Sequence, residues 1–209
     1  MNKKKNKPKK GIVTKEIILK KAVELLTEVG LESASVRQIA KLANISSAAA
    51  FYHFPTKESL IMEIIYYVVL SNHQKVSTLI SIYDNAFERL LKHIQGNLQW
   101  AQENKQEAQI LLLFYYLGSS NDDFSKMYGE ILARARNRIK EHLLAGQREN
   151  IFHFKIDVEV LTEIIHNTLV GDFVNQSSSK LQSNMRSTQW VQFLTDLTKY
   201  ESLKTNSIS

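Results

Sequence analysis

The segment SSAAAFYHFPTK at residues 46–57 gathers hydroxyl, phenol, imidazole and ammonium groups within one short stretch. Side chains of these types bind the phosphate backbone of nucleic acids, which they contact without reading its sequence. Tyr52, His53 and Lys57 are the strongest candidates, and a helix that begins near Lys57 would add its backbone amides and dipole. Without DNA contact, Tyr52 would be a partly buried aromatic residue and His53 would end a helix. The segment therefore indicates phosphate contact rather than covalent chemistry.

The reading of base edges would fall to the residues just before these groups. Ser47 can bond to bases or to phosphate, and the methyl groups of Ala48 and Ala49 can contact thymine. Arg37 can reach the DNA backbone or a guanine, or it can be a solvated surface charge. The predicted DNA-contacting residues are Thr14, Ser35, Arg37, Gln38, Ser46, Ser47, Ala48, Ala49, Phe51, Tyr52, His53 and Lys57.

Three short helices, the last two joined by a sharp turn, would position these groups. The first is predicted from Thr14, an N-cap, to Gly30, a residue type that ends helices. The second begins at Ser35, which opens a capping box. Asn44 tolerates the left-handed conformation that a turn needs, and Ser46 then caps the third helix. This order of elements predicts a helix-turn-helix.

Positive charge is concentrated in and before these helices. The chain has a net charge of +6, and residues 1–60 hold 12 Lys and Arg against 5 Asp and Glu. Such asymmetry indicates a polyanionic partner at one end of the molecule and favours nucleic acid, such as a double-stranded DNA operator, over an anionic membrane. Residues 1–13 carry six lysines without periodicity, which predicts a disordered basic arm. The arm would lie along phosphates or in a minor groove, or serve only as a solubilising tail.

Composition favours an all-α chain with a substantial core. The sequence has 209 residues, of which 44% are hydrophobic, and only 2 prolines and 7 glycines interrupt it. There is no cysteine, so disulfides and thiolate chemistry are excluded. The apolar runs fall far short of the roughly 20 residues of a membrane span, and no secretory signal follows the basic arm. These features predict a cytoplasmic protein.

Apolar residues recur with helical spacing through the rest of the chain and predict six further helices, which makes nine in all. The predicted ranges are 56–79, 85–104, 106–117, 122–146, 157–176 and 188–200. Loops are expected at residues 118–121 and 177–179, where glycine, serine and asparagine gather.

The stretches SVRQIAKLANIS and AFYHFPTKESL, within residues 14–64, carry a specific pattern. It comprises a capped second helix with a central Ile-Ala pair, a short turn, an aromatic-His-Phe ending and a Lys-Glu helix start. This pattern resembles that of TetR-type transcriptional regulators, the tetracycline-repressor family. The resemblance implies an all-α fold of about nine helices, a homodimer formed mainly by the last two, and a ligand pocket. The predicted division of the chain is a disordered basic arm at 1–13, a helix-turn-helix DNA-binding domain at 14–58, and a ligand-binding and dimerisation domain at 59–203.

The head departs from the family pattern at the turn and in the third helix. Asn44 stands at the usual turn glycine, and Phe51 stands at an aromatic position that is usually Tyr. Ser47-Ala48 stands where the family has Lys or Thr followed by Gly. The third helix therefore offers few hydrogen-bond donors to base edges. We expect sequence specificity to depend more on Arg37, Gln38, the lysine arm and DNA shape.

The body offers residues for an apolar or amphipathic small-molecule effector. Ligand pockets combine apolar walls with a few polar groups, although aromatic residues at helical spacing usually belong to the core. The candidate ligand-binding residues are Trp100, Phe114, Tyr115, Tyr128, Ile131, His166 and Asn167.

The sequence holds no motif for enzymatic or metal chemistry. Its six histidines, at positions 53, 73, 93, 142, 153 and 166, are never three or four residues apart. Without cysteines they predict no metal site, and a nucleophile elbow and a glycine-rich phosphate loop are also missing. We therefore predict neither a cofactor nor an enzyme.

The function favoured by these features is a ligand-responsive DNA-binding transcriptional regulator, a repressor by resemblance. It would bind a pseudo-palindromic operator as a homodimer. One alternative is a helical lipid or acyl-ligand carrier whose basic end touches membranes. Another is a DNA-binding protein with a filled core that responds to no ligand.

Overall fold

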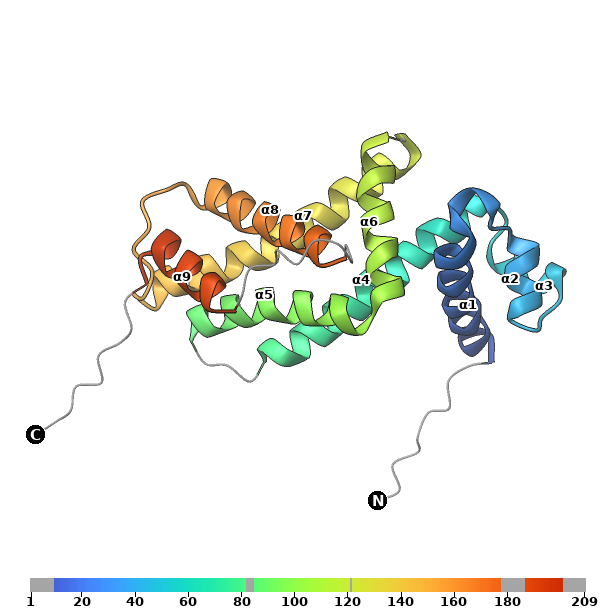
Figure 1. Ribbon diagram of the computed structural model, residues 1–209, viewed down its shortest axis with the longest axis horizontal. Coiled ribbons are helices and arrows are strands. Elements are labelled where there is room, and N and C mark those ends of the chain that lie inside the picture. The colour runs from blue at the N-terminus through green and yellow to red at the C-terminus, as the bar shows by residue number, and fades with distance from the viewer. Residues whose placement is uncertain (1–9, 82–84, 121, 178–186, 201–209) are drawn as a thin grey trace, which may run out of the picture.

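The computed structural model describes residues 10–81, 85–120, 122–177 and 187–200, and these ranges consist of helices and the segments between them (Figure 1). The helices are α1 (Lys10–Ser33), α2 (Val36–Leu42), α3 (Ser47–His53), α4 (Lys57–Ile80), α5 (Ala86–Glu103), α6 (Lys105–Ser120), α7 (Asp122–Arg148), α8 (Val158–Ser177) and α9 (Ser187–Thr198). The predicted all-α fold is confirmed for this part of the chain. No helix within it is both long and apolar enough to cross a membrane.

The molecule is elongated, with α1–α3 forming a head at one end and α5–α9 forming a body at the other (Figure 1). Helix α4 begins in the head and runs into the body, where it packs along α5. Helix α6 contacts both α1 and α4, while α7 packs against α5, α6 and α8. Helix α9 contacts α5 at the end of the body far from the head.

Helix α1 begins earlier than its sequence predicts. It starts at Lys10, so the backbone of Thr14 lies inside the helix and the prediction that Thr14 caps it is wrong. Residues 10–13, predicted to be part of a disordered arm, form its first turn even though Gly11 disfavours a helix, because extending an existing helix costs little. Residues 1–9 lie outside the described ranges. At the other end, Gly30 interrupts the helix with φ 80° and ψ 166°, a conformation essentially restricted to glycine, as expected.

Helix α6 continues beyond its predicted end. Residues 118–120 were expected in a loop, but α6 runs to Ser120, and Asn121 lies outside the described residues. Gly118 is needed for close packing, since a Cβ at this position would overlap the ring of Tyr128 on α7. Similarly, α8 includes Ser177, and the rest of the loop expected there is outside the described ranges.

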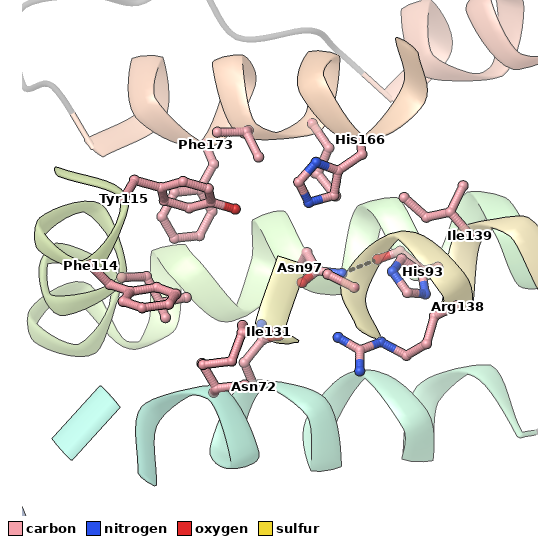
Figure 2. Close-up of a pocket in the computed structure, with 15 residues that line it drawn as sticks. Asn72, His93, Asn97, Phe114, Tyr115, Ile131, Arg138, Ile139, His166 and Phe173 are labelled. Atoms are coloured by element: carbon pink, nitrogen blue, oxygen red, sulfur yellow. Dashed lines mark hydrogen bonds between the residues drawn. The ribbon is translucent and has the colours of Figure 1, made fainter. Parts of the chain in front are cut away.

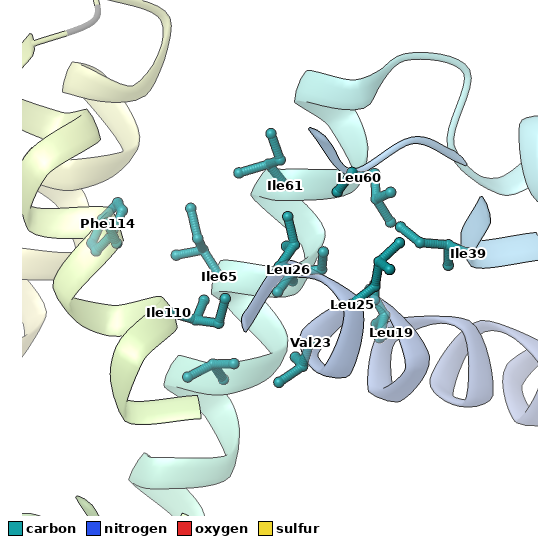
Figure 3. Packing of buried hydrophobic residues seen from close by; sticks show 14 of the residues in the cluster. Leu19, Val23, Leu25, Leu26, Ile39, Leu60, Ile61, Ile65, Ile110 and Phe114 are labelled. Atoms are coloured by element: carbon teal, nitrogen blue, oxygen red, sulfur yellow. The ribbon is translucent and has the colours of Figure 1, made fainter. Parts of the chain in front are cut away.

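The buried apolar residues form two clusters. The first joins α1–α3 to α4 and α6, and it includes Ile39, Leu60, Ile110 and Phe114 (Figure 3). The second lies in the outer half of the body, between α5, α7, α8 and α9. Because the first cluster passes from head to body without interruption, the division at residue 58 stays a prediction.

The outer end of the body is fixed by a buried hydrogen bond. Trp190 Nε1 of α9 donates to Asp172 Oδ2 of α8 at 2.9 Å, and both side chains are buried. A buried carboxylate is costly unless it is hydrogen-bonded, so this contact ties α9 to the body in one position.

Gly146 near the end of α7 offers a test of this packing. A Cβ there would overlap the ring of Phe152, whereas a Cβ at Gly129, on the same helix, would meet no atom within 4 Å. Gly146→Ala should therefore lower the free energy of unfolding by about 1–3 kcal/mol through overpacking. Gly129→Ala should raise it by about 0.5–1 kcal/mol through helix propensity. Urea unfolding followed by circular dichroism measures both, and an equal effect of the two substitutions would contradict the close approach.

Candidate functional site

Two side-chain caps and one left-handed residue build the helix-turn-helix. Ser35 Oγ accepts a hydrogen bond from Gln38 N at 3.3 Å, which opens α2, and Ser46 Oγ accepts one from Ala49 N at 3.1 Å, which opens α3. Between them Asn44 adopts φ 54°, as its residue type predicts. In a capping box the Gln38 side chain would accept a hydrogen bond from the backbone amide of Ser35. Here the Gln38 side chain accepts from the Ser35 hydroxyl instead, with Ser35 Oγ donating to Gln38 Oε1 at 2.8 Å.

Helix α3 separates a buried face from a solvent-facing one. Ala50 and the following Phe54 are fully buried in the head core. Ser47 and Ala48 are exposed on the outer face, and Tyr52 is 84% exposed. An aromatic residue so exposed stabilises no core, so its ring and hydroxyl are available to an external partner.

The junction of α3 and α4 gathers the remaining predicted phosphate contacts. The His53 ring packs edge-on against Tyr52, with ring centroids 5.4 Å apart. Thr56 caps α4 in a full capping box: Ser59 N donates to Thr56 Oγ1 at 3.0 Å, and Thr56 N donates to Ser59 Oγ at 3.1 Å. Lys57 is the first residue of α4, so its charge lies at the positive end of a helix dipole.

The cations of the head differ in their pairing. Three cations of α1 pair with nearby glutamates, in the pairs Lys15–Glu63, Lys20–Glu16 and Lys21–Glu24. Arg37 and Lys41 of α2 are exposed and form no ion pair with a described residue. Positive charge is thus left on the α2 side of the head, next to the exposed face of α3.

The structure brings the predicted DNA-contacting residues between Ser35 and Lys57 together on α2, α3 and the start of α4. Thr14 is the exception: it belongs to α1, and its side chain is outside the described part of the structure.

A cavity of about 90 Å³ lies in the body between α4, α5, α6, α7 and α8 (Figure 2). It is lined by Val69, Asn72, His93, Asn97, Leu111, Phe114, Tyr115, Ile131, Ala135, Arg138, Ile139, His166, Leu169, Val170 and Phe173. A second pocket, of about 280 Å³, shares Asn72, His93, Asn97 and Arg138 with it and continues toward the exposed Ser77 and Glu141.

Four of the residues predicted to bind a ligand line the inner cavity, namely Phe114, Tyr115, Ile131 and His166. The other three do not. Trp100 is 1% exposed within the first apolar cluster, and Tyr128 packs behind the cavity wall, with its ring centroid 5.4 Å from that of Phe114. Asn167 is exposed on the outer side of α8.

Sequence reasoning missed the polar residues of the cavity, which are Asn72, His93, Asn97 and Arg138. A signal was present on α5, where His93 and Asn97 follow Leu90 at helical spacing on an otherwise apolar face. A polar residue that recurs in an apolar stripe is either paired in the core or functional.

Burial controls the ionisation of these groups. Desolvation, followed by the charges of His142 and Arg138, lowers the pKa of His93 well below its ordinary value. Desolvation, followed by the charge of Arg136, lowers the pKa of His166 to about 4, although a hydrogen bond with Asn167 partly opposes this. Desolvation also lowers the pKa of the neighbouring His142 to about 4 and raises that of Tyr115 to about 12. At neutral pH the cavity therefore holds neutral imidazoles and a neutral phenol. No group of three or more metal-ligating side chains occurs among the described residues.

Comparison with known proteins agrees with this architecture. Residues 18–64 match the family described as bacterial regulatory proteins, tetR family. The chain is 26% identical over 161 residues to the HTH-type transcriptional repressor KstR2 of Rhodococcus jostii (strain RHA1), which covers 70% of this chain and 72% of that protein. It is 24% identical over 164 residues to the HTH-type transcriptional regulator YdgC of Bacillus subtilis (strain 168), covering 75% and 77% respectively.

A solved structure shows the same fold. It is a transcriptional regulator from Saccharomonospora viridis in complex with choline, with a TM-score of 0.76, 20% sequence identity, and coverage of 91% of this chain and 100% of that one.

A helix-turn-helix head joined by a long helix to an all-α body defines a DNA-binding transcriptional regulator. Residues 18–64 therefore belong to the tetR family of bacterial regulatory proteins, and the chain as a whole has the fold of a solved transcriptional regulator. It is accordingly a DNA-binding transcription factor and not an enzyme.

The neutral imidazoles make stability depend on pH. His142 and His166 have a folded pKa of about 4, below the ordinary 6.5, so the unfolded chain binds more protons between these values. Stability is therefore present above about pH 6.5 and is lost as pH falls toward about 4. The free energy of unfolding should fall by about 2 kcal/mol per imidazole between pH 7 and pH 5.

Urea unfolding at the two pH values measures this loss. The double variant His142→Gln and His166→Gln should lose much less stability on acidification than the unmodified chain. An equally steep loss in the double variant would show that the imidazoles do not cause it.

Proposed function

We propose that this protein is a cytoplasmic, ligand-responsive repressor that binds a pseudo-palindromic operator as a homodimer. The observation that carries the DNA-binding part is the exposed face of α3, which ends in a largely exposed Tyr52 beside the capped start of α4. The proposed contacts are Ser35, Arg37, Gln38, Ser46, Ser47, Ala48, Ala49, Phe51, Tyr52, His53 and Lys57.

The contacts divide by chemistry. Tyr52, His53 and Lys57 would hold phosphates, and the N-terminal amides of α4 would assist them. The exposed outer residues of α3 are small, so base reading there is limited to methyl contacts and one hydroxyl. Arg37 and Gln38 at the start of α2 are exposed and can add contacts to bases or backbone.

An exposed stripe on α8 supports the homodimer. Val160, Ile164, Gly171 and Val174 lie along one face of this helix and are exposed, with Val160 at 49% and Val174 at 46%. The opposite face of α8 is buried in the body, so the helix is apolar on two sides. A stripe with a glycine and β-branched residues suits close packing against its own symmetry mate, and Val191 of α9 extends it.

The first apolar cluster supports a response to ligand. It contains head residues such as Ile39 and also Phe114 and Phe173, which line the cavity. A ligand that moved the cavity wall would therefore press on α4 and α6, which contact α1. To act, it must bind the DNA-free arrangement of the heads more tightly than the DNA-bound one. Related proteins provide precedents, since one is a named repressor and another was crystallised with choline.

Removal of a phosphate contact tests the proposed interface. Lys57→Ala and Tyr52→Ala should each weaken binding to operator and to random DNA about equally, by roughly 10-fold, because phosphate contacts carry no sequence information. Lys57→Ala should also flatten the dependence of log affinity on log salt by about 0.9. Fluorescence anisotropy at several salt concentrations measures both quantities.

Tyr116→Ala is the matched control, because Tyr116 is 66% exposed but lies on α6 in the body. If Tyr52→Ala binds DNA as tightly as this control, Tyr52 is not a contact.

A charge on the α8 stripe tests the dimer. Ile164→Glu should convert the protein to a monomer in light scattering coupled to size exclusion, because the unpaired carboxylate would be buried in the interface. Operator affinity should fall with it, since the two heads would no longer bind as one unit. Leu70→Glu is the control: Leu70 is 54% exposed on α4, and this variant should remain dimeric. Persistence of the Ile164→Glu dimer would rule out this stripe as the interface.

A further inference from the structure

Arg138 brings a positive charge to the cavity without a counter-ion from its walls. Its guanidinium extends from α7 toward α4, into the region lined by Asn72 and His93 (Figure 2). None of the residues that line the inner cavity is Asp or Glu. Glu141 lines the outer pocket instead, where it accepts a hydrogen bond from Asn137 Nδ2 at 2.8 Å.

The other cations in this stretch of α7 form ion pairs. Each is paired with a glutamate on the same helix or on α8, in the pairs Arg134–Glu130 at 3.2 Å, Arg136–Glu163 at 2.7 Å, and Lys140–Glu159. Arg138 faces the cavity and forms no ion pair with a described residue. The positive charge of Arg138 acts on the histidines around the two pockets, since it contributes to lowering the pKa of His73, His93 and His166. Burial lowers the pKa of Arg138, and the charge of Glu141 in the outer pocket offsets this only in part. An anion in the cavity would stabilise this half-buried cation further.

Three further polar atoms near this charge lack hydrogen-bond partners within the described structure. They are Asn72 Nδ2, His93 Nδ1 and His166 Nδ1. The two histidines are each only 5% exposed, so bulk water has little access to hydrogen-bond with these nitrogens. Asn72 Nδ2 is a donor, and a neutral imidazole can donate from Nδ1 in one of its tautomers. A carboxylate accepts hydrogen bonds only, at up to about four positions, which matches this set of donors.

The rest of the cavity is apolar. Leu111, Phe114 and Phe173 form much of the wall away from Arg138, and the Tyr115 hydroxyl points into the space between α6 and α8 (Figure 2). The volume of about 90 Å³ is well below the roughly 300 Å³ at which sites for drug-sized ligands begin, so the apolar portion of a ligand must be short.

We infer that the effector is a small organic acid whose carboxylate is bound by Arg138 with Asn72, His93 and His166, and whose short apolar tail contacts Phe114 and Phe173. This inference rests on the proposed ligand-responsive function. Asn72 belongs to α4 and Arg138 to α7, so a shared carboxylate would connect the helix that leads to the head with the centre of the body.

Isothermal titration calorimetry on the purified full chain without DNA tests the inference. The probes are hexanoate, its neutral analogue hexanamide, and the cation pentylammonium, which share a pentyl tail and differ in the charge of a small head group. Hexanoate should bind at least about 10-fold more tightly than either of the others, because charge-assisted hydrogen bonds are made only with the anion. Equal or tighter binding of the amide or the cation would overturn the inference, as would no detectable binding of hexanoate.

Two variants and a control locate the site. Arg138→Gln should weaken hexanoate binding by about 10- to 100-fold while leaving the weak binding of hexanamide unchanged. Arg138→Lys should recover part of the loss, since it restores the charge but not the planar donor geometry. Arg134→Gln removes an exposed arginine of the same helix and should bind hexanoate normally. Undiminished hexanoate binding by Arg138→Gln would overturn the assignment of Arg138.

The comparison of the three probes on the unmodified chain needs no variant, so it remains decisive if Arg138→Gln does not fold. Operator binding, measured separately, distinguishes the two levels of the argument. A protein that binds operator but prefers the amide retains the proposed DNA-binding function and loses the organic-acid inference. A protein that binds hexanoate but no operator loses the proposed function.

Discussion

The structure depends on one continuous apolar contact between the head and the body. Residues of α1, α2 and α3 pack on the first turns of α4, and the same buried cluster continues through Ile110 and Phe114 of α6. Burial of apolar area is the largest favourable term in folding, and close-packed interiors transmit small displacements because few voids absorb them. The orientation of the head is therefore set by side chains that also form the wall of the cavity. In this molecule DNA binding and ligand binding share one core.

The cavity is the part of that core where packing and polarity conflict. A core built for stability alone would fill this volume with apolar groups, since buried polar atoms without partners cost free energy. Here Arg138, Asn72 and two imidazoles converge from α4, α5, α7 and α8 on one hollow. The two imidazoles are neutral at neutral pH, and no Asp or Glu lines the inner cavity, so Arg138 brings the one full charge to its wall. A site of this kind trades stability for the ability to bind an anion.

The helix-turn-helix could be predicted almost completely because its determinants are local. Ser35 and Ser46 accept hydrogen bonds from amides three residues later, and the conformation of Asn44 follows from its own side chain. Errors arose where a residue has two roles. Gly118 has the composition of a loop but is required by the ring of Tyr128 on another helix, and Thr14 has the chemistry of a cap but lies within α1.

The sequence by itself determined the number, order and approximate ends of the helices, the charge of the head and the family pattern, because these depend on residues a few positions apart. Only the tertiary structure decided which side chains meet. Phe114, Tyr115, Ile131 and His166 line the cavity while Trp100, Tyr128 and Asn167 do not, and the unpaired Arg138 emerges only when α7 is placed against α4. Helical spacing gives the face on which a residue lies but not the face it meets, and that choice is made by the packing of five helices at once.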